Sequence, residues 1–381
     1  MIDTSYIIPP VSRELLVAEL KHKYFFRKTN NGDKEIYITT AHQSPNVMRE
    51  IGRLRELSYA LDGGGTGKDC DLDEYDTLPE PYCFKQLIVW NPKDLEIVGG
   101  YRFIHGSNMQ FLADGSVNTP TAHLFQFSED FVQNYLPYTI ELGRAFVQPA
   151  YQPSVDLRKG IFSLDNLWDG LAGLPLEVPE TRYFFGKITM YPQMNSQAKD
   201  AILYFMQKYF PDPEGLVWPY EPLPIKSDLN SLNALFVGRS YKENMQILSR
   251  YCRGLGENVP ALVSAYANLC PTSLRCFGTS INKDFGDTDE TGILVPIRDI
   301  VPEKWERHAG SYSEKNPVFD RNHLFKINMK RLPWWKNIND DERAELRRLR
   351  MLKRQAAQNV RAERKRIRRI RRENRRSGGQ E

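Results

Sequence analysis

The chain has 381 residues, of which 41% are hydrophobic and 12% aromatic, enough for one large or two ordinary globular domains with a sizeable core. It lacks an apolar run near the roughly 18–20 residues of a membrane-spanning helix. The residues MIDTSYIIPPVSRE show no basic stretch followed by an apolar run, so we do not expect them to act as a secretory signal. The five cysteines are odd in number and form no CxxC pair, which disfavours a disulfide framework or a zinc site and favours a reduced cytoplasm.

The net charge of +4 conceals a strong asymmetry along the chain. Residues 341–376 carry 16 Lys and Arg against 5 Asp and Glu, a balance of +11, so the remainder carries −7. An acidic body is therefore joined to a strongly basic tail. Such a tail favours a polyanionic partner, either a membrane surface or nucleic acid.

The N-terminal part predicts a helix, a hairpin and a second helix. Ser44 followed by Pro45 is a typical helix start. The glycine-rich run at 63–67 ends that helix, and it lacks the Lys-Ser/Thr pair of a phosphate loop. The first helix is expected at 12–20, and the hairpin strands at 23–28 and 35–40, around the turn NNGD.

The rest of the chain predicts alternating strands and helices. Asp165 is expected to cap a helix that runs through Leu171, and a Pro-rich loop is expected at 211–224. The pattern indicates a mixed α/β or α+β fold with one twisted, largely antiparallel sheet. Strands are expected at 84–90, 97–106, 138–149, 181–191, 273–281 and 292–298, and helices near 124–136 and at 196–209, 241–254 and 259–269.

The strand at 138–149 contains two charged residues among β-forming apolar ones. Ile140, Leu142 and Phe146 favour a buried strand, yet Glu141 and Arg144 lie within it. Ionised side chains are rarely fully buried unless they are paired or used for function. Glu141 and Arg144 are therefore candidate functional residues.

An acidic cluster, DCDLDEYD, occupies residues 69–76. It lacks the Gly at position six and the Glu at position twelve of a calcium loop, so metal binding and a solvated acidic turn are the less favoured interpretations. We expect an ion-pair network with Arg53 or Arg55 that shapes a substrate entrance. Arg102, in a strand with paired glycines that mark a bulge or a close approach, is suited to orient a carboxylate bidentately.

Taken in order, several motifs resemble a known enzyme family. The run REIGRLRELSY, DLDEYD, LIVW…IVGGYRFI, IELGRAFVQPAYQ and YFFGKITMYP is similar to the acyl-carrier-protein-dependent N-acyltransferases that make lyso-aminolipids, the glycine-lipid and ornithine-lipid synthases. These enzymes are distantly similar to acyl-homoserine-lactone synthases and to GNAT acetyltransferases. The resemblance covers about residues 50–300, and NVMREIGRLRE and KQLIVWNP look closest to the Bacteroidetes-type glycine-lipid enzymes.

The resemblance implies a GNAT-like mixed twisted sheet flanked by helices, and transfer of a 3-hydroxyacyl chain from acyl carrier protein. The acceptor would be the α-amine of glycine, with ornithine as the alternative, and the product would pass to a second, O-acylating enzyme. No metal or redox cofactor is implied. The acetyltransferase pyrophosphate loop, [QR]-x-x-G-x-[GA], is replaced by QPSVDLRKGIF, which favours phosphopantetheine-linked acyl carrier protein over coenzyme A.

The resemblance also implies roles for individual residues. The donor thioester would lie along the central strand where that strand parts from its neighbour, with Glu141 as the general base. Arg144 would orient the substrate carboxylate or pair with the acidic cluster. The alternative is that Glu141 and Arg144 only hold the acidic loop by ion pairs. The expected substrate-binding residues are Arg53, Arg55, Asp71, Asp73, Asp76, Arg102, Phe146 and Val147.

The sequence of the basic tail predicts an amphipathic helix at 339–377, with Asn339 and Glu342 in the pattern of a capping box. We expect it to bind an anionic membrane surface or acyl carrier protein at the inner face of the cell membrane. Nucleic acid is an alternative partner, which would suit a binding protein built on an inactive acyltransferase fold. A solvated helix, or one docked on another partner, is the remaining alternative. The expected organisation is an N-terminal extension at 1–43, an acyltransferase domain at 44–310, a linker at 311–338 and the tail.

Overall fold

The computed structural model describes residues 2–178, 180–310 and 312. The chain divides into two units, Met1–Asp320 and Arg321–Glu381, and every described residue belongs to the first. Beyond residue 310 only Tyr312 is described, so the expected linker at 311–338 and the basic helix at 339–377 otherwise lie outside the described residues.

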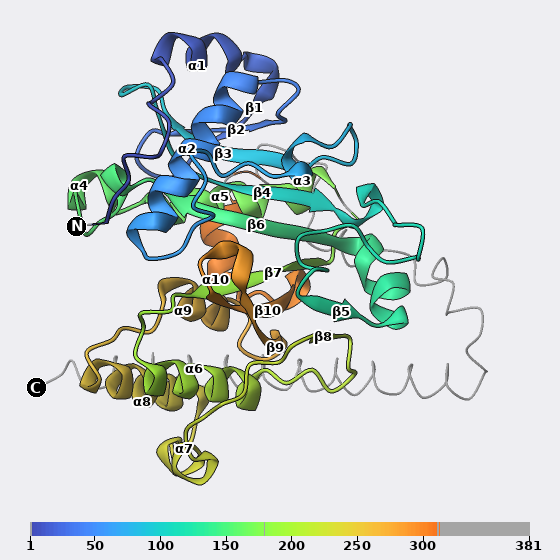
Figure 1. Cartoon of the computed structure of the whole chain (residues 1–381), viewed down its shortest axis with the longest axis vertical. Coiled ribbons are helices and arrows are strands. Elements are labelled where there is room, and N and C mark those ends of the chain that lie inside the picture. The colour runs from blue at the N-terminus through green and yellow to red at the C-terminus, as the bar shows by residue number, and fades with distance from the viewer. Residues whose placement is uncertain (1, 179, 311, 313–381) are drawn as a thin grey trace, which may run out of the picture. The chain divides into compact units, whose positions relative to one another are not determined.

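Within the described part of the chain, eight strands form one mixed sheet in the order β1-β2-β3-β4-β6-β7-β10-β9 (Figure 1). Neighbouring strands are antiparallel except β6 and β7. This confirms the expected mixed fold with a largely antiparallel sheet. The strands are β1 Phe25–Lys28, β2 Glu35–Thr39, β3 Lys85–Asn91, β4 Glu96–His105, β6 Thr139–Val147, β7 Tyr183–Met190, β9 Arg275–Asn282 and β10 Thr288–Pro296.

Helices cover both faces of the first half of this sheet, in which β1 of the N-terminal segment pairs with β2, and β2 pairs with β3. Helix α2 (Pro45–Leu61) packs its apolar side, together with α1 (Arg13–Glu19), against Ile88 and Trp90 of β3. Helix α5 (Ser163–Glu177) lies on the opposite face, where Gly170 is in close contact with Leu87. Successive strand residues point to opposite faces, which places one helical layer on each side.

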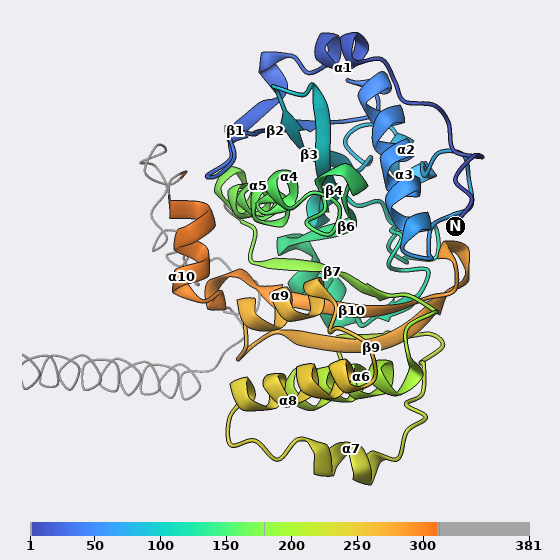
Figure 2. The ribbon, with the colours of Figure 1, turned by 90° about the vertical axis from the view of Figure 1, so that its left-hand side faces the viewer.

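The second half of the sheet carries its own helices (Figure 2). Helix α6 (Ser196–Tyr209) packs against β9, and α8 (Tyr241–Gly254) packs against α6. A separate ribbon of β5 (Phe125–Phe127) and β8 (Val217–Pro219) contacts the sheet at β9. The other α-helices of the described residues are α3 Glu74–Thr77, α4 Leu157–Gly160, α7 Leu229–Leu235, α9 Ala261–Leu269 and α10 Pro302–Trp305.

Two sequence-based expectations need correction. The helix expected near 124–136 is instead strand β5 followed by a π-helical turn at Phe131–Tyr135. Its aromatic residues fill a core with Phe185 and Phe277, so their apolar spacing reflects packing contacts and not one helical face. Asp165 does not cap α5, which begins at Ser163 and continues past Leu171 to Glu177. Asp165 lies in its first turn, where a carboxylate favours the helix dipole.

The parallel contact between β6 and β7 is short. Residues Thr139–Glu141 of β6 pair with Tyr183–Phe185 of β7, and the pairing then stops. Beyond Glu141, β6 continues along β4 and β7 continues along β10, so the two strands diverge. The edge of β6 from Leu142 to Val147 that faces β7 therefore has no strand partner in the described part of the chain.

A bulge in β6 lies on its opposite edge, beside β4. Arg102 pairs with Gly143 and Gly100 pairs with Phe146, so β6 contains one extra residue between these pairs. Arg144 lies in this bulge with φ +49°, a left-handed conformation that is uncommon for a side chain of its size. The bulge sits at the point where β6 leaves β7, and it redirects the Arg144 side chain.

Candidate active site

A cavity of about 1820 Å³ opens where β6 and β7 diverge. It is bounded by the end of α2, the loop at 64–68, the acidic cluster, both diverging strands, and residues of α5 and α9. Because α2 and α5 lie on opposite faces of the sheet, the cavity reaches both faces through the gap in strand pairing. It can therefore hold a long substrate alongside the free edge of β6.

Glu141 lies at the last paired position of β6 and lines this cavity. Its Oε1 accepts a hydrogen bond from Thr121 Oγ1 at 2.6 Å, whereas its buried Oε2 has no hydrogen-bond partner among the described residues. Burial raises the pKa of Glu141, and the Thr121 hydrogen bond and the charge of Lys187 oppose that shift. A buried carboxylate with a raised pKa and an open oxygen is suited to accept a proton.

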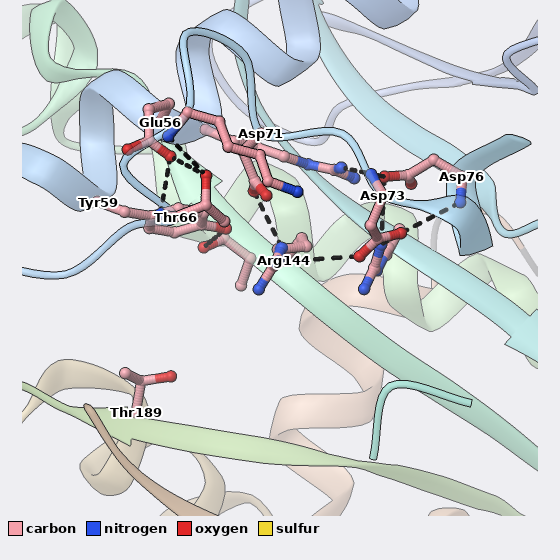
Figure 3. Close-up of polar contacts among 12 residues, drawn as sticks. Glu56, Tyr59, Thr66, Asp71, Asp73, Asp76, Arg144 and Thr189 are labelled. Atoms are coloured by element: carbon pink, nitrogen blue, oxygen red, sulfur yellow. Dashed lines mark hydrogen bonds and ion pairs between the residues drawn. The ribbon is translucent and has the colours of Figure 1, made fainter. Parts of the chain in front are cut away.

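The acidic cluster and three arginines form one network of ion pairs (Figure 3). Arg55 pairs with Asp76 at 3.1 Å, and Arg102 pairs with Asp73 at 2.7 Å and with Asp76 at 3.2 Å. Arg144 lies between Asp71 at 2.9 Å and Asp73 at 3.8 Å. The charges of three carboxylates are thus neutralised by three guanidiniums. Arg55 takes part in the ion-pair network, as expected from the sequence.

Burial and the nearby guanidiniums shift the pKa values of the carboxylates in this network in different directions. Burial alone would raise the pKa of Asp76, but the guanidiniums of Arg55 and Arg102 lower it to about 2. Burial raises the pKa of Asp71, although Arg144 is close. The Arg144–Asp71 contact is an ion pair without hydrogen-bond alignment. Asp76 is therefore the ionised centre of the network.

Arg53 lies outside this network. Its guanidinium pairs with Glu50 one turn earlier in α2, at 2.6 Å, and it is not among the residues that line the cavity. Two helical positions separate Arg53 from Arg55, a rotation of about 200°, so the two side chains leave opposite sides of α2. Of the two arginines considered from the sequence, only Arg55 meets the acidic cluster.

The end of α2 is fastened to the bulge of β6. Tyr59 donates a hydrogen bond from its hydroxyl to the Ala145 carbonyl oxygen at 3.0 Å. Phe285 packs edge-on against Tyr59, and the Arg144 guanidinium lies 4.4 Å from the Phe285 ring centroid. Phe146 and Val147, both expected to bind substrate, line the cavity beyond this point. The bulge, α2 and the acidic cluster thus form one side of the cavity.

Comparison with known proteins identifies the family. A family model described as an acetyltransferase (GNAT) domain matches residues 54–158. Two proteins named glycine N(alpha)-acyltransferase, from Phocaeicola vulgatus and Bacteroides thetaiotaomicron, are each 50% identical to the chain over 311 residues, which is 82% of this chain. The match covers 94% and 91% of those proteins, respectively. The chain belongs to the glycine Nα-acyltransferase family. No solved structure matches it.

Membership of this family makes the chain an acyltransferase, and it removes the alternative of an inactive fold that only binds nucleic acid. The GNAT match spans the acidic cluster, Arg102, Glu141 and Arg144. It ends at residue 158, in the short helix α4 that follows β6. Within the described residues of this acyltransferase, no helix is both long and apolar enough to cross a membrane.

Several polar residues of the cavity were not singled out from the sequence. Lys187 and Glu290 lie on β7 and β10 and line the cavity, while Thr121 binds Glu141 from the loop before β5. Lys187 carries the same signal as Glu141, a charge inside an otherwise apolar strand. Glu56 of α2, fully buried, accepts hydrogen bonds from Thr66 and from the Gly67 amide, and so holds the glycine-rich loop.

Proposed function

We propose that this acyltransferase moves a 3-hydroxyacyl chain from acyl carrier protein to the α-amine of glycine. The product is a lyso-aminolipid, which a second enzyme then O-acylates. The names of the two relatives support glycine as the acceptor. The observation that carries the proposal is the unfilled oxygen of Glu141 beside the free edge of β6.

The geometry supports direct transfer to the amine. Glycine is held with its ammonium at Glu141, which takes one proton and leaves a lone pair on nitrogen. The amine attacks the thioester carbonyl carbon, a C–N bond forms, and the C–S bond breaks. The second proton lost by the nitrogen passes to the departing sulfur, so that an amide and the carrier's thiol are released. Backbone N–H groups on the unpaired edge of β6 stabilise the oxyanion that forms in between.

The loop after β6 supports acyl carrier protein, and not coenzyme A, as the donor. There Asp156 caps the short helix α4, and its carboxylate accepts hydrogen bonds from the backbone amides of Arg158 at 2.9 Å and Lys159 at 3.1 Å. A pyrophosphate would need such amides as donors and would be repelled by the carboxylate that occupies them. The phosphopantetheine arm of a carrier protein has no pyrophosphate to place there.

The cavity also supports a long acyl chain. Part of its wall is apolar, and β6, the segment 160–167 and α9 contribute some of the residues of that part. Burial of each methylene group there contributes about 0.8 kcal/mol. These apolar residues are Leu142, Ile161, Leu164, Leu167, Leu262 and Tyr266.

The proposal is tested by supplying defined donors and acceptors to the purified enzyme. A 3-hydroxyacyl chain is presented on acyl carrier protein or on coenzyme A, with glycine or ornithine, and products are identified by mass spectrometry. We expect N-acylglycine from the carrier-protein donor. Lipid extracts of cells that express the gene should contain the same compound. If ornithine alone is acylated, glycine is not the acceptor. If transfer occurs from coenzyme A alone, acyl carrier protein is not the donor.

A further inference from the structure

A second charged pair faces the cavity from the strand opposite Glu141. Phe185 of β7 is the register partner of Glu141, and Lys187 lies two residues further along β7. Since strand side chains alternate with a period of two, Lys187 points to the same face of the sheet as Phe185. Lys187 and Glu141 both line the cavity, one on each side of the divergence.

The described residues supply the ammonium of Lys187 with no hydrogen-bond acceptor. Its nearest carboxylate oxygen is Glu290 Oε2, 4.0 Å from Nζ, which is beyond hydrogen-bond distance. No hydrogen bond of Nζ occurs among the described residues. Glu290 directs its other oxygen to Thr189 Oγ1 at 3.1 Å and Thr288 Oγ1 at 3.4 Å. Lys187 is nevertheless largely buried, with 16% of its side chain exposed.

Other cations of the cavity differ from Lys187 in one of two ways. Arg102 and Arg144 each contact two carboxylates of the acidic cluster. Lys283 is 72% exposed, and Lys68 is also exposed. Among these cations Lys187 alone combines burial with unfilled donors. An ammonium in that state is stabilised when an anionic ligand supplies the missing acceptor.

The acceptor of the proposed reaction is a zwitterion, whose carboxylate lies one carbon away from its amine. With the amine at Glu141, the carboxylate lies within reach of the opposite side of the divergence. We infer that Lys187 binds the α-carboxylate of the acceptor, an inference that rests on the proposed function. Glu141 and Lys187 then recognise the two ends of one amino acid, and Arg144 is left to its ion pairs with Asp71 and Asp73.

The test compares glycine with glycinamide, which keeps the amine and lacks the carboxylate, in the wild type and in Lys187→Met. Removing a hydrogen bond to a charged group costs about 10- to 100-fold in binding. We expect the KM for glycine to rise by about that factor, with kcat much less affected. The kcat/KM for glycinamide should stay unchanged, so the preference for glycine disappears. Any difference in amine basicity cancels, because both enzymes meet the same two acceptors.

Lys199→Met is the matched control, because Lys199 is similarly buried, pairs with Asp289 at 2.7 Å, and lies outside the cavity. Its preference for glycine should equal that of the wild type. Lys187→Arg, which keeps the charge, should restore part of the preference. If Lys187→Met does not fold, the same ratio in Lys187→Gln decides. A wild type that does not acylate glycine overturns the proposed function, whereas an unchanged preference in a folded Lys187 variant overturns this inference alone.

Discussion

The surroundings of Glu141 fit the proposed catalytic role better than a stabilising one. Its side chain is buried, yet one oxygen has no hydrogen-bond partner among the described residues. An ionised carboxylate in such a site lowers the stability of the fold. A glutamine or an apolar residue of similar volume would avoid this loss. Arg144 pairs with Asp71 and Asp73, whereas no ion pair joins Glu141 to the described residues within 4.0 Å, so the two charges of this strand have different surroundings.

Replacing Glu141 by Gln keeps the shape of the side chain and removes its proton affinity. General base catalysis is worth about 10²–10⁴-fold, and we expect kcat/KM to fall by that order at neutral pH. Part of the rate should return at high pH, where the amine deprotonates unaided. Glu129→Gln, an exposed change outside the cavity, is the control. Normal activity at pH 7 would remove Glu141 from the mechanism and direct attention to Asp73, which lines the cavity as Asp76 does not.

The same variant makes a prediction about stability. The pKa of Glu141 is raised above its usual 4.5 in the folded state, so the folded protein holds this proton to higher pH than the unfolded chain does. The contribution of Glu141 to stability therefore falls as the pH rises above about 4.5. Glu141→Gln lacks this loss, and its free energy of unfolding in urea should match or exceed that of the wild type at pH 7. A large loss of stability would indicate a structural role.

Asp76 behaves in the opposite way. Its pKa is lowered from 3.8 to about 2 in the folded state, so its stabilising contribution is complete above pH 3.8 and is lost as the pH falls toward 2. Asp76→Asn should abolish this part of the acid transition. It also leaves buried Arg55 without its carboxylate, which costs about 3–5 kcal/mol at neutral pH. Urea unfolding measured from pH 7 to pH 2 checks both effects, and Arg55→Met added to Asp76→Asn should restore part of the loss.

At the scale of elements, the bulge of β6 depends on the paired glycines of β4. A Cβ atom on Gly99 would collide with the Phe146 carbonyl oxygen, and one on Gly100 would lie 2.8 Å from the Leu87 oxygen. The backbones of three strands therefore approach each other more closely there than side chains allow. The sequence suggested that these glycines mark a bulge or a close approach of another backbone, and the structure shows both features at this place.

Gly99→Ala should consequently destabilise the protein. Overpacking at a backbone contact typically costs about 1–3 kcal/mol, and here it would also displace the strand that carries Arg144. Gly254→Ala is the control, since Gly254 ends α8 with open space at its Cβ and no positive φ. Thermal unfolding should show a lower midpoint for Gly99→Ala and no decrease for Gly254→Ala. Equal midpoints would show that the bulge can relax.

Local patterns were enough to predict most elements. Helices α6 and α8 begin and end at the residues expected, because their apolar periodicity agrees with their capping residues, Asn195 and Ser240. The short parallel contact of β6 and β7 was not readable, because it joins strands that are distant in sequence and depends on tertiary packing. Lys187 was missed for the same reason. Its strand was predicted, but its neighbours in the cavity come from β6 and β10.

For the whole molecule, the unequal distribution of charge predicts that the basic tail binds an anionic surface independently of the enzyme body. Deleting residues 341–381 should leave the fold intact, because the described core lies within Met1–Asp320. Sedimentation with anionic vesicles should fall on deletion, most clearly at low salt, where electrostatic attraction of the full chain is greatest. Neutral vesicles are the control. If the shortened protein sediments with anionic vesicles as the full chain does, the tail is not the membrane-binding segment.

The unpaired edge of β6 from Leu142 to Val147 also has a consequence for isotope exchange. Backbone amides on that edge have no carbonyl of β7 to bind, so they should take up deuterium quickly while their neighbours in β3 and β4 stay protected. An acyl donor lying along the edge would cover them and slow the uptake. Deuterium uptake at this edge of β6 would then measure binding of the donor before any covalent bond is made or broken.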